Sequence, residues 1–228
     1  MTPAVVSGVL RDAVRDVAGV EVGDVALRCV GAGVYASPVA LRLGLDAEGL
    51  VEAVSHRGIA AEVDAGFVIL RVRAGALPEA IVDDPGYGLV GGVPECRLSD
   101  RPRVFENPGF SVRYAYARAR AVQRRAGEFG VRGGPVEPAG DELALIQVLG
   151  EMPGWARSAA RKGDGSVLAR ALFQVADAFH TVYERCPALP VEEKPSAVHA
   201  SRVTIAAAAG IALRNGLTMI GETPRERI

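Results

Sequence analysis

Apolar residues recur at two different spacings in the first third of the chain, and these spacings predict helices and strands. Residues 2–17 place five valines and one leucine at helical spacing, which predicts an amphipathic helix, and residues 47–57 also read as helical. The alternation in residues 66–73 predicts a strand, and a shorter strand is expected at residues 25–30. Together these elements predict a small α+β unit over residues 1–82.

No periodic pattern survives between residues 83 and 109, a stretch with four prolines and five glycines. This composition predicts a linker or surface loop of unusual length. Within it, GYGLVGG (86–92) has the glycine spacing of dinucleotide-binding loops, but it neither follows a clear strand nor opens a helix. We therefore interpret it as a flexible loop and predict no cofactor.

The pattern is helical from residue 110 to residue 228, which predicts an all-α helical bundle. In the third predicted helix, one apolar seam runs from Leu168 to Cys186. The candidate helices cover residues 110–129, 140–161, 166–186 and 197–215, the last closed by Asn215-Gly216. The predicted fold class is thus an α+β N-terminal domain (1–82), a linker (83–109) and a helical bundle (110–228).

Charge divides the chain in a similar place. The formal net charge is −1, yet residues 1–104 carry ten basic and fourteen acidic side chains, whereas residues 105–228 carry sixteen and thirteen. Three widely spaced cysteines suggest neither a disulfide framework nor a zinc site, and no run is apolar enough to predict a membrane span. These features predict a cytoplasmic protein without a metal, whose two halves have different roles.

The segment SVRYAYARARAVQRRA (111–126) concentrates five arginines and two tyrosines on one predicted helix. On a helical wheel, Arg113, Arg120 and Arg124 lie together, and Arg118 and Arg125 form a second column beside Tyr114. The opposite arc, which should face the bundle, contains Val112, Ala115, Ala119, Val122, Ala126 and Phe129. An uncompensated double arginine stripe is suited to binding a phosphate backbone. The alternative is a solvated face whose arginines pair with acidic side chains of neighbouring helices.

The sequence offers no catalytic constellation. Its three histidines (His56, His180 and His199) are isolated and lack metal-ligand spacing, and no serine or cysteine has the context of an activated nucleophile. The single tryptophan, Trp155, follows Met152-Pro153 and is expected to pack at a helix bend.

Five segments resemble, in the same order, segments of arginyl-tRNA synthetases. In the N-terminal part, YASPVALRL (35–43) resembles the family's YASN-x-A-x-RL, and AGFVILRVR (65–73) resembles its GF-x-N-x-R strand. In the bundle, ENPGFSVRYAYARAR (106–120) resembles NPVYYVQYAHAR, and LARALFQVADAFHTVYERCPAL (168–189) resembles LARYL…AFHxFYNxC. The stretch ASRVTIAAAAGIALRNGLTMIGETPRERI (200–228) resembles the closing segment ARLxL…VLxNGLxLLGIxxPERM.

This resemblance implies an N-terminal additional domain joined directly to a DALR-type anticodon-binding domain. The family's ATP-binding catalytic domain would lie between them, where residues 83–109 stand, and neither an HxGH signature nor a KMSKS-like loop occurs. The resemblance therefore implies a protein that is not an enzyme and whose partner is tRNA, specifically an arginine isoacceptor.

The resemblance also implies individual contacts with tRNA. Phe67 matches the aromatic residue with which the family's additional domain touches the D-loop, although Ile69 replaces the accompanying amide. Tyr183 and Ile228 match the aromatic and the C-terminal residue of the anticodon-side pocket, Ile228 in place of methionine. The full set of predicted RNA-binding residues is Arg113, Tyr114, Arg118, Arg120, Arg124, Arg125, Tyr183, Arg225, Arg227, Ile228 and Phe67.

Two function hypotheses remain open at this stage. The first is a non-catalytic tRNA-binding protein that presents or sequesters tRNA for another, tRNA-dependent enzyme. The second is a scaffold or regulatory module, including the tRNA-binding half of a split synthetase, that binds protein and has lost tRNA binding. Acidic partners for Arg113, Arg120 and Arg124 would weaken the first hypothesis.

Overall fold

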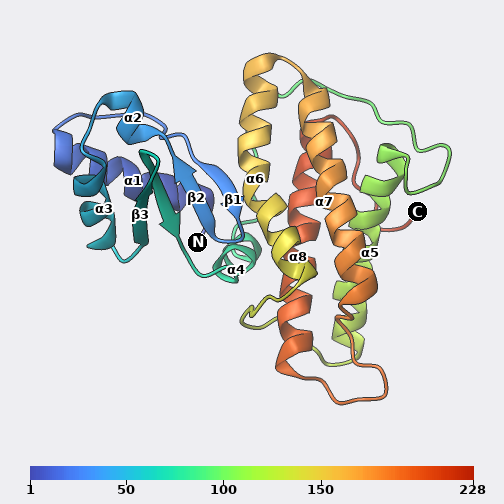
Figure 1. The fold of residues 1–228 in the computed structure, drawn as a ribbon. Helices are drawn as coiled ribbons and strands as arrows, with labels where there is room; N and C mark the ends of the chain where they lie inside the picture. The colour runs from blue at the N-terminus through green and yellow to red at the C-terminus, as the bar shows by residue number, and fades with distance from the viewer.

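The computed structural model describes residues 1–228 and shows two units that lie side by side, a small sheet with helices and a bundle of long helices (Figure 1). The elements are α1 (Pro3–Ala18), β1 (Arg28–Gly31), β2 (Val34–Ser37), α2 (Val39–Leu43), α3 (Ala47–Ser55), β3 (Ala60–Asp64), β4 (Phe67–Arg71), α4 (Ala76–Val82), α5 (Pro108–Glu128), α6 (Asp141–Lys162), α7 (Gly165–Arg185) and α8 (Ala197–Met219). The predicted fold class, an α+β domain followed by an all-α bundle, is confirmed.

The N-terminal sheet has the strand order β1-β2-β4-β3, and all neighbouring strands are antiparallel. Fourteen buried residues form its core, among them Leu10, Tyr35 and Leu70. The sequence pattern did not reveal β2, β3 or α4. In β3 no residue is fully buried, because it is an edge strand, and its sequence AAEVD therefore lacks a clear apolar alternation.

The bundle has a separate core of 34 buried residues, to which all four long helices contribute. Its last helix continues through Asn215-Gly216 to Met219, so the predicted end at residue 215 is wrong. Asn215 is buried, and its amide donates to the carbonyl oxygens of Pro85 (3.0 Å) and Tyr87 (2.9 Å). Gly216 packs so closely on Leu172 that a Cβ would lie 2.2 Å from the leucine Cδ2. Here the glycine serves close packing, and α8 does not end at it.

Residues 83–107 contain no helix or strand, as predicted, but they are fixed along the bundle. The Tyr87 side chain is 2% exposed, and its hydroxyl donates to the Leu149 carbonyl oxygen at 2.7 Å. Further along, the Cys96 amide donates to the Ile220 carbonyl oxygen at 2.9 Å. The interpretation of GYGLVGG as a flexible loop is therefore wrong, because Tyr87 contributes to the bundle core.

The two units contact one another directly. Leu77 and Ile81 of α4 are buried in the bundle core, so this helix packs with the bundle although it precedes residue 83. On α6, Gly150 lies so close to Cys29 of β1 that a Cβ would come within 2.8 Å of the thiol sulfur. The N-terminal unit thus contacts the bundle through β1, which packs on α6.

Candidate nucleic-acid interface

Helix α5 carries most of the predicted RNA-binding residues, and its orientation decides which of them are accessible. Asn107 caps the helix, since its side chain accepts from the Gly109 amide at 3.1 Å, and Pro108 occupies the first turn. The predicted inner arc is buried at Val112, Ala115, Ala119, Val122 and Ala126. Phe129 is 53% exposed, contrary to prediction, because it follows the last helical residue.

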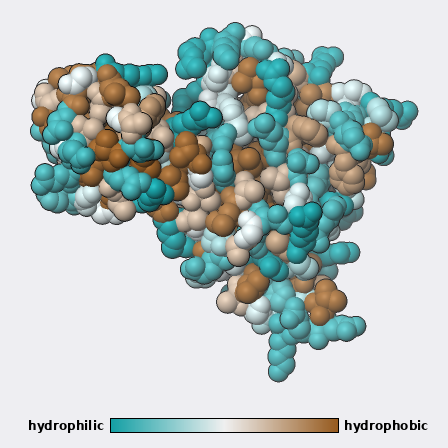
Figure 2. Space-filling model, in the orientation of Figure 1, coloured by the Kyte–Doolittle hydropathy of each residue, from teal (hydrophilic) through white to brown (hydrophobic).

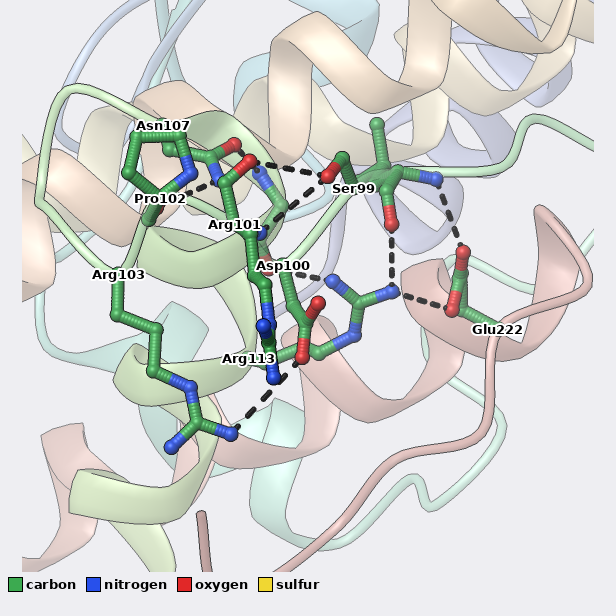
Figure 3. A network of polar contacts seen from close by, with 10 residues as sticks. Ser99, Asp100, Arg101, Pro102, Arg103, Asn107, Arg113 and Glu222 are labelled. Atoms are coloured by element: carbon green, nitrogen blue, oxygen red, sulfur yellow. Dashed lines mark hydrogen bonds and ion pairs between the residues drawn. The ribbon is translucent and has the colours of Figure 1, made fainter.

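Arg113 lies in an internal polar network that joins α5, the preceding segment and the C-terminal tail (Figure 3). Its guanidinium donates to the carbonyl oxygens of Gly109 (2.8 Å) and Leu98 (2.9 Å) and to the Glu222 carboxylate (2.6 Å). The Arg113 and Glu222 side chains are only 15% and 16% exposed. The expectation of a free phosphate-binding Arg113 is therefore wrong, since both of its terminal nitrogens donate to protein acceptors.

The network predicts unequal roles for the two glutamates of the tail. Glu222→Ala is expected to lower the free energy of unfolding by about 2–3 kcal/mol, because it leaves a half-buried guanidinium unpaired. Glu226→Ala, in the same tail but 47% exposed, is expected to change it by less than about 1 kcal/mol. Urea unfolding of both variants measures the difference, and equal effects would contradict the assignment of Glu222 as the anchor.

Arg118 fills the centre of an aromatic cluster. Its guanidinium carbon lies 4.6 Å from the Tyr114 ring centroid and 4.5 Å from that of Tyr183. It also donates to Glu184 at 3.3 Å, and its side chain is 16% exposed. Arg118 therefore joins α5 to α7 through cation–π contacts, and the prediction of an accessible phosphate ligand at this position is wrong.

His180 belongs to the same cluster, since its ring contacts those of Phe105 and Tyr114. Its Nε2 lies 3.2 Å from the Ser111 carbonyl oxygen, and its Nδ1 lies 3.2 Å from an Arg118 nitrogen. A carbonyl only accepts and a guanidinium only donates, so the ring carries its proton on Nε2 and accepts at Nδ1. Burial lowers the pKa of His180, which favours this neutral form.

Arg120 and Arg124 share one acidic partner from the tail. Glu226 lies 2.9 Å from Arg120 Nε and 3.3 Å from an Arg124 nitrogen. The side chains of Arg120, Arg124 and Glu226 are 42%, 38% and 47% exposed, respectively. The predicted uncompensated stripe is therefore wrong, because the tail supplies a carboxylate that the pattern on α5 could not show. Such exposed pairs are worth about 0–1 kcal/mol, so a phosphate can compete for these arginines.

Three further arginines are exposed and form no ion pair: Arg125 on α5, and Arg225 and Arg227 in the tail. A groove of about 440 Å³ lies between α5, α7 and the tail. Its lining includes Tyr114, Arg118, Arg124, Arg125, Tyr183, Arg227 and Ile228. The structure thus gathers most of the predicted residues around one groove, although they are far apart in the sequence.

Tyr183 lies between that groove and a second, mainly apolar pocket of about 260 Å³. The pocket lies against α7 and the segment after it, and its wall includes Phe179, Val182, Leu189 and Val191. Arg125 contributes to both cavities. A cation and an exposed aromatic ring beside an apolar pocket can accommodate an unpaired base together with its phosphate.

Phe67 does not join this groove. It is 38% exposed at the start of β4, whereas the strand that contacts α6 is β1, two strands away in the sheet. Ile69, which stands at the position of the family's amide, is only 9% exposed and cannot donate or accept a hydrogen bond through its side chain. The predicted contact at Phe67 therefore belongs to a separate surface.

Two aromatic residues near the groove escaped the sequence analysis. Phe110 stacks on Tyr114 with a centroid distance of 5.3 Å, and Phe105 lies 4.9 Å from the His180 ring. Phe105 belongs to the proline- and glycine-rich segment, where no periodicity places a side chain. An aromatic residue in an otherwise polar segment was the only available signal.

The structure contains neither a membrane-crossing helix nor a metal-binding cluster. None of its helices has the length and hydrophobicity that a membrane crossing requires. No cluster of three or more histidine, cysteine or acidic side chains is arranged so that it could hold a metal ion.

Comparisons with known proteins match the helical bundle to a domain family. Residues 112–228 match the sequence profile of the DALR anticodon binding domain. Among solved structures, the chain is similar to Thermus thermophilus arginyl-tRNA synthetase, with 27% identity, a TM-score of 0.47, and coverage of 55% of this chain and 22% of that chain. It is also similar to a Campylobacter jejuni protein assigned as an arginyl-tRNA synthetase, with 16% identity, a TM-score of 0.48, and coverage of 79% and 44%. The chain therefore spans less than half the length of either protein. Because the matched region is more than half of the chain, this protein belongs to the DALR anticodon binding domain family.

Proposed function

We propose that this protein binds tRNA through the groove between α5, α7 and the C-terminal tail, and that it presents or sequesters the tRNA for another enzyme without aminoacylating it. The observation that carries the proposal is the DALR domain at residues 112–228, whose groove is lined by exposed arginines and by Tyr183. The resemblance of the sequence to arginyl-tRNA synthetases points to an arginine isoacceptor. The three cysteines are free, which is compatible with the cytoplasmic location expected from the sequence.

Cations for phosphates and an aromatic surface for a base lie close together at the groove, and this combination supports an RNA loop as the ligand. Arg120 and Arg124 on one face of α5, and Arg125 on the neighbouring face, offer cations to phosphates, and these contacts carry affinity without sequence information. Tyr183 and the adjoining apolar pocket offer a stacking surface for an unpaired base. Phe67, on the other unit, offers a second contact to a different part of the same tRNA.

A gel-shift titration of tRNA at about 50 mM and about 200 mM salt tests the proposal. Binding in the micromolar range that weakens steeply between the two salt concentrations is expected, because several phosphates displace counterions. Failure to bind any tRNA at the lower salt concentration would overturn the proposal.

Glu226→Gln is expected to strengthen tRNA binding by about 3-fold to 10-fold at low salt, because it removes the carboxylate that pairs with Arg120 and Arg124. Glu128→Gln is the matched control, since Glu128 lines the same groove and has the same charge but forms no ion pair with these arginines. Fluorescence anisotropy with labelled tRNA measures both variants. An equal gain in both would mean that Glu226 acts only through net charge.

One observation favours the second candidate function, a protein-binding scaffold. Arg113 and Arg118 are committed to internal contacts, and Glu226 partly neutralises the remaining face. A surface that no longer binds tRNA would be expected to have its arginines engaged or neutralised in this way. In that case the titration above would show no binding at low salt.

A further inference from the structure

The segment before α5 is held in one conformation although it contains no helix or strand. Asn107 donates from its side-chain amide to the Pro102 carbonyl oxygen at 2.8 Å, and the Val104 amide donates to the same oxygen at 3.0 Å (Figure 3). At its other end, Ser99 packs directly on Gly109, where a Cβ would lie 1.9 Å from the serine carbonyl oxygen. The loop of residues 99–107 is thus hydrogen-bonded and closely packed at the beginning of α5.

This loop presents an aromatic ring to solvent. Phe105 is 44% exposed, yet its ring contacts those of Phe110 (6.2 Å), Tyr114 (5.8 Å) and His180 (4.9 Å). Figure 2 shows hydrophobic side chains at the surface near the beginning of α5, among hydrophilic ones. Because the ring is held by its neighbours, little conformational entropy is lost when a ligand stacks on it.

The ring also adjoins the proposed tRNA groove. The Arg118 guanidinium carbon lies 5.4 Å from the Phe105 centroid and 4.5 Å from that of Tyr183, so Arg118 connects the two aromatic residues. Tyr183, like Arg118, lines the groove. The aromatic surface therefore continues from the groove across Arg118 to the loop.

Phe105 lies among charged side chains, and such surroundings are more compatible with a nucleotide than with a purely apolar partner. Arg101 and Arg103 are exposed in the same loop, and Arg101 forms no ion pair. Arg103 is paired with Asp100 only weakly, since their charged atoms are 4.0 Å apart and both side chains are more than half exposed. Glu106 is the other acidic side chain of the loop.

From this arrangement we propose that Phe105 is a stacking platform for an unpaired RNA base that lies next to the nucleotides in the groove. The inference rests on the proposed function and extends it: the ligand is an RNA with a single-stranded loop, and the loop before α5 takes part in binding it. Stacking on an aromatic residue is tolerant of base identity, so Phe105 contributes affinity for unpaired RNA without choosing a sequence.

The test compares Phe105→Ala with Val104→Ala, a neighbouring apolar residue of similar exposure (43% for Val104). The probes are a tRNA transcript and a fully paired RNA duplex, and thermal unfolding verifies that both variants fold. Phe105→Ala is expected to weaken tRNA binding by about 5-fold to 100-fold while leaving duplex binding unchanged. Val104→Ala should bind both RNAs as the wild type does.

A second variant gives a direct signal of stacking. Phe105→Trp should retain tRNA affinity, and the fluorescence of the new indole should be quenched by tRNA but not by the duplex. Wild-type affinity of Phe105→Ala for tRNA, or an unquenched indole in the complex, would overturn this inference and leave the proposed function intact. Absence of tRNA binding by the wild type would overturn both.

Discussion

Reversing the charges of Arg120 and Arg124 together, as Arg120→Glu/Arg124→Glu, is expected to weaken tRNA binding by about 100-fold at low salt. Each arginine is predicted to contact a phosphate, and a charge-assisted hydrogen bond is worth about 1.5–3 kcal/mol. Two such contacts amount to at least about 3 kcal/mol, which corresponds to about two orders of magnitude in the dissociation constant. The dependence of log K on log salt should also become shallower by about two, because two fewer counterions are released.

The control for this variant is Arg161→Glu/Lys162→Glu at the turn between α6 and α7. Both side chains are exposed and form no ion pair, and the change in net charge is the same. This turn lies at the top of the bundle in Figure 1, whereas the C-terminus lies lower, on the side of α5. If the control weakens binding as much as the α5 variant does, the groove is not the binding site. If thermal unfolding shows that the α5 variant is folded and binds tRNA like the wild type, the proposed phosphate contacts are wrong.

The largest effect on stability is expected for Phe179→Ala. The side chain is 1% exposed in the bundle core, and its ring lies 6.2 Å from that of Tyr183. Truncation should lower the free energy of unfolding by about 3–5 kcal/mol, because it removes buried apolar surface and leaves a cavity beneath the apolar pocket. Urea unfolding measures the loss.

Val198→Ala is the matched control for Phe179→Ala. Val198 lies on α8 and is 53% exposed, so its truncation should change the free energy of unfolding by no more than about 0.5 kcal/mol. A loss below about 1 kcal/mol for Phe179→Ala would show that the core under Tyr183 is loosely packed. It would then be a poor support for a stacking surface.

The sequence predicted the long elements well and the short ones poorly. Helices α5 to α8 begin within about two residues of their predicted starts, since periodic apolar seams and residues such as Pro108 mark them locally. Strands β2 and β3 escaped because their sequences, VYAS and AAEVD, hold few large apolar residues, so no alternation stands out. The end of α8 was placed too early because Asn215-Gly216 is a stop signal that tertiary packing overrides.

For the candidate interface, the sequence alone determined which helix carries the cations and which side chains form its buried arc. Both follow from the spacing of residues along one helix. Only the tertiary structure decided which arginines are free, because ion pairing depends on residues that are distant in the sequence. Glu222 pairs with Arg113 across 109 positions, and Glu226 pairs with Arg120 across 106. In the folded protein the five arginines therefore have different environments. Arg113 pairs with Glu222, Arg118 lies among aromatic rings, Arg120 and Arg124 share Glu226, and Arg125 is unpaired.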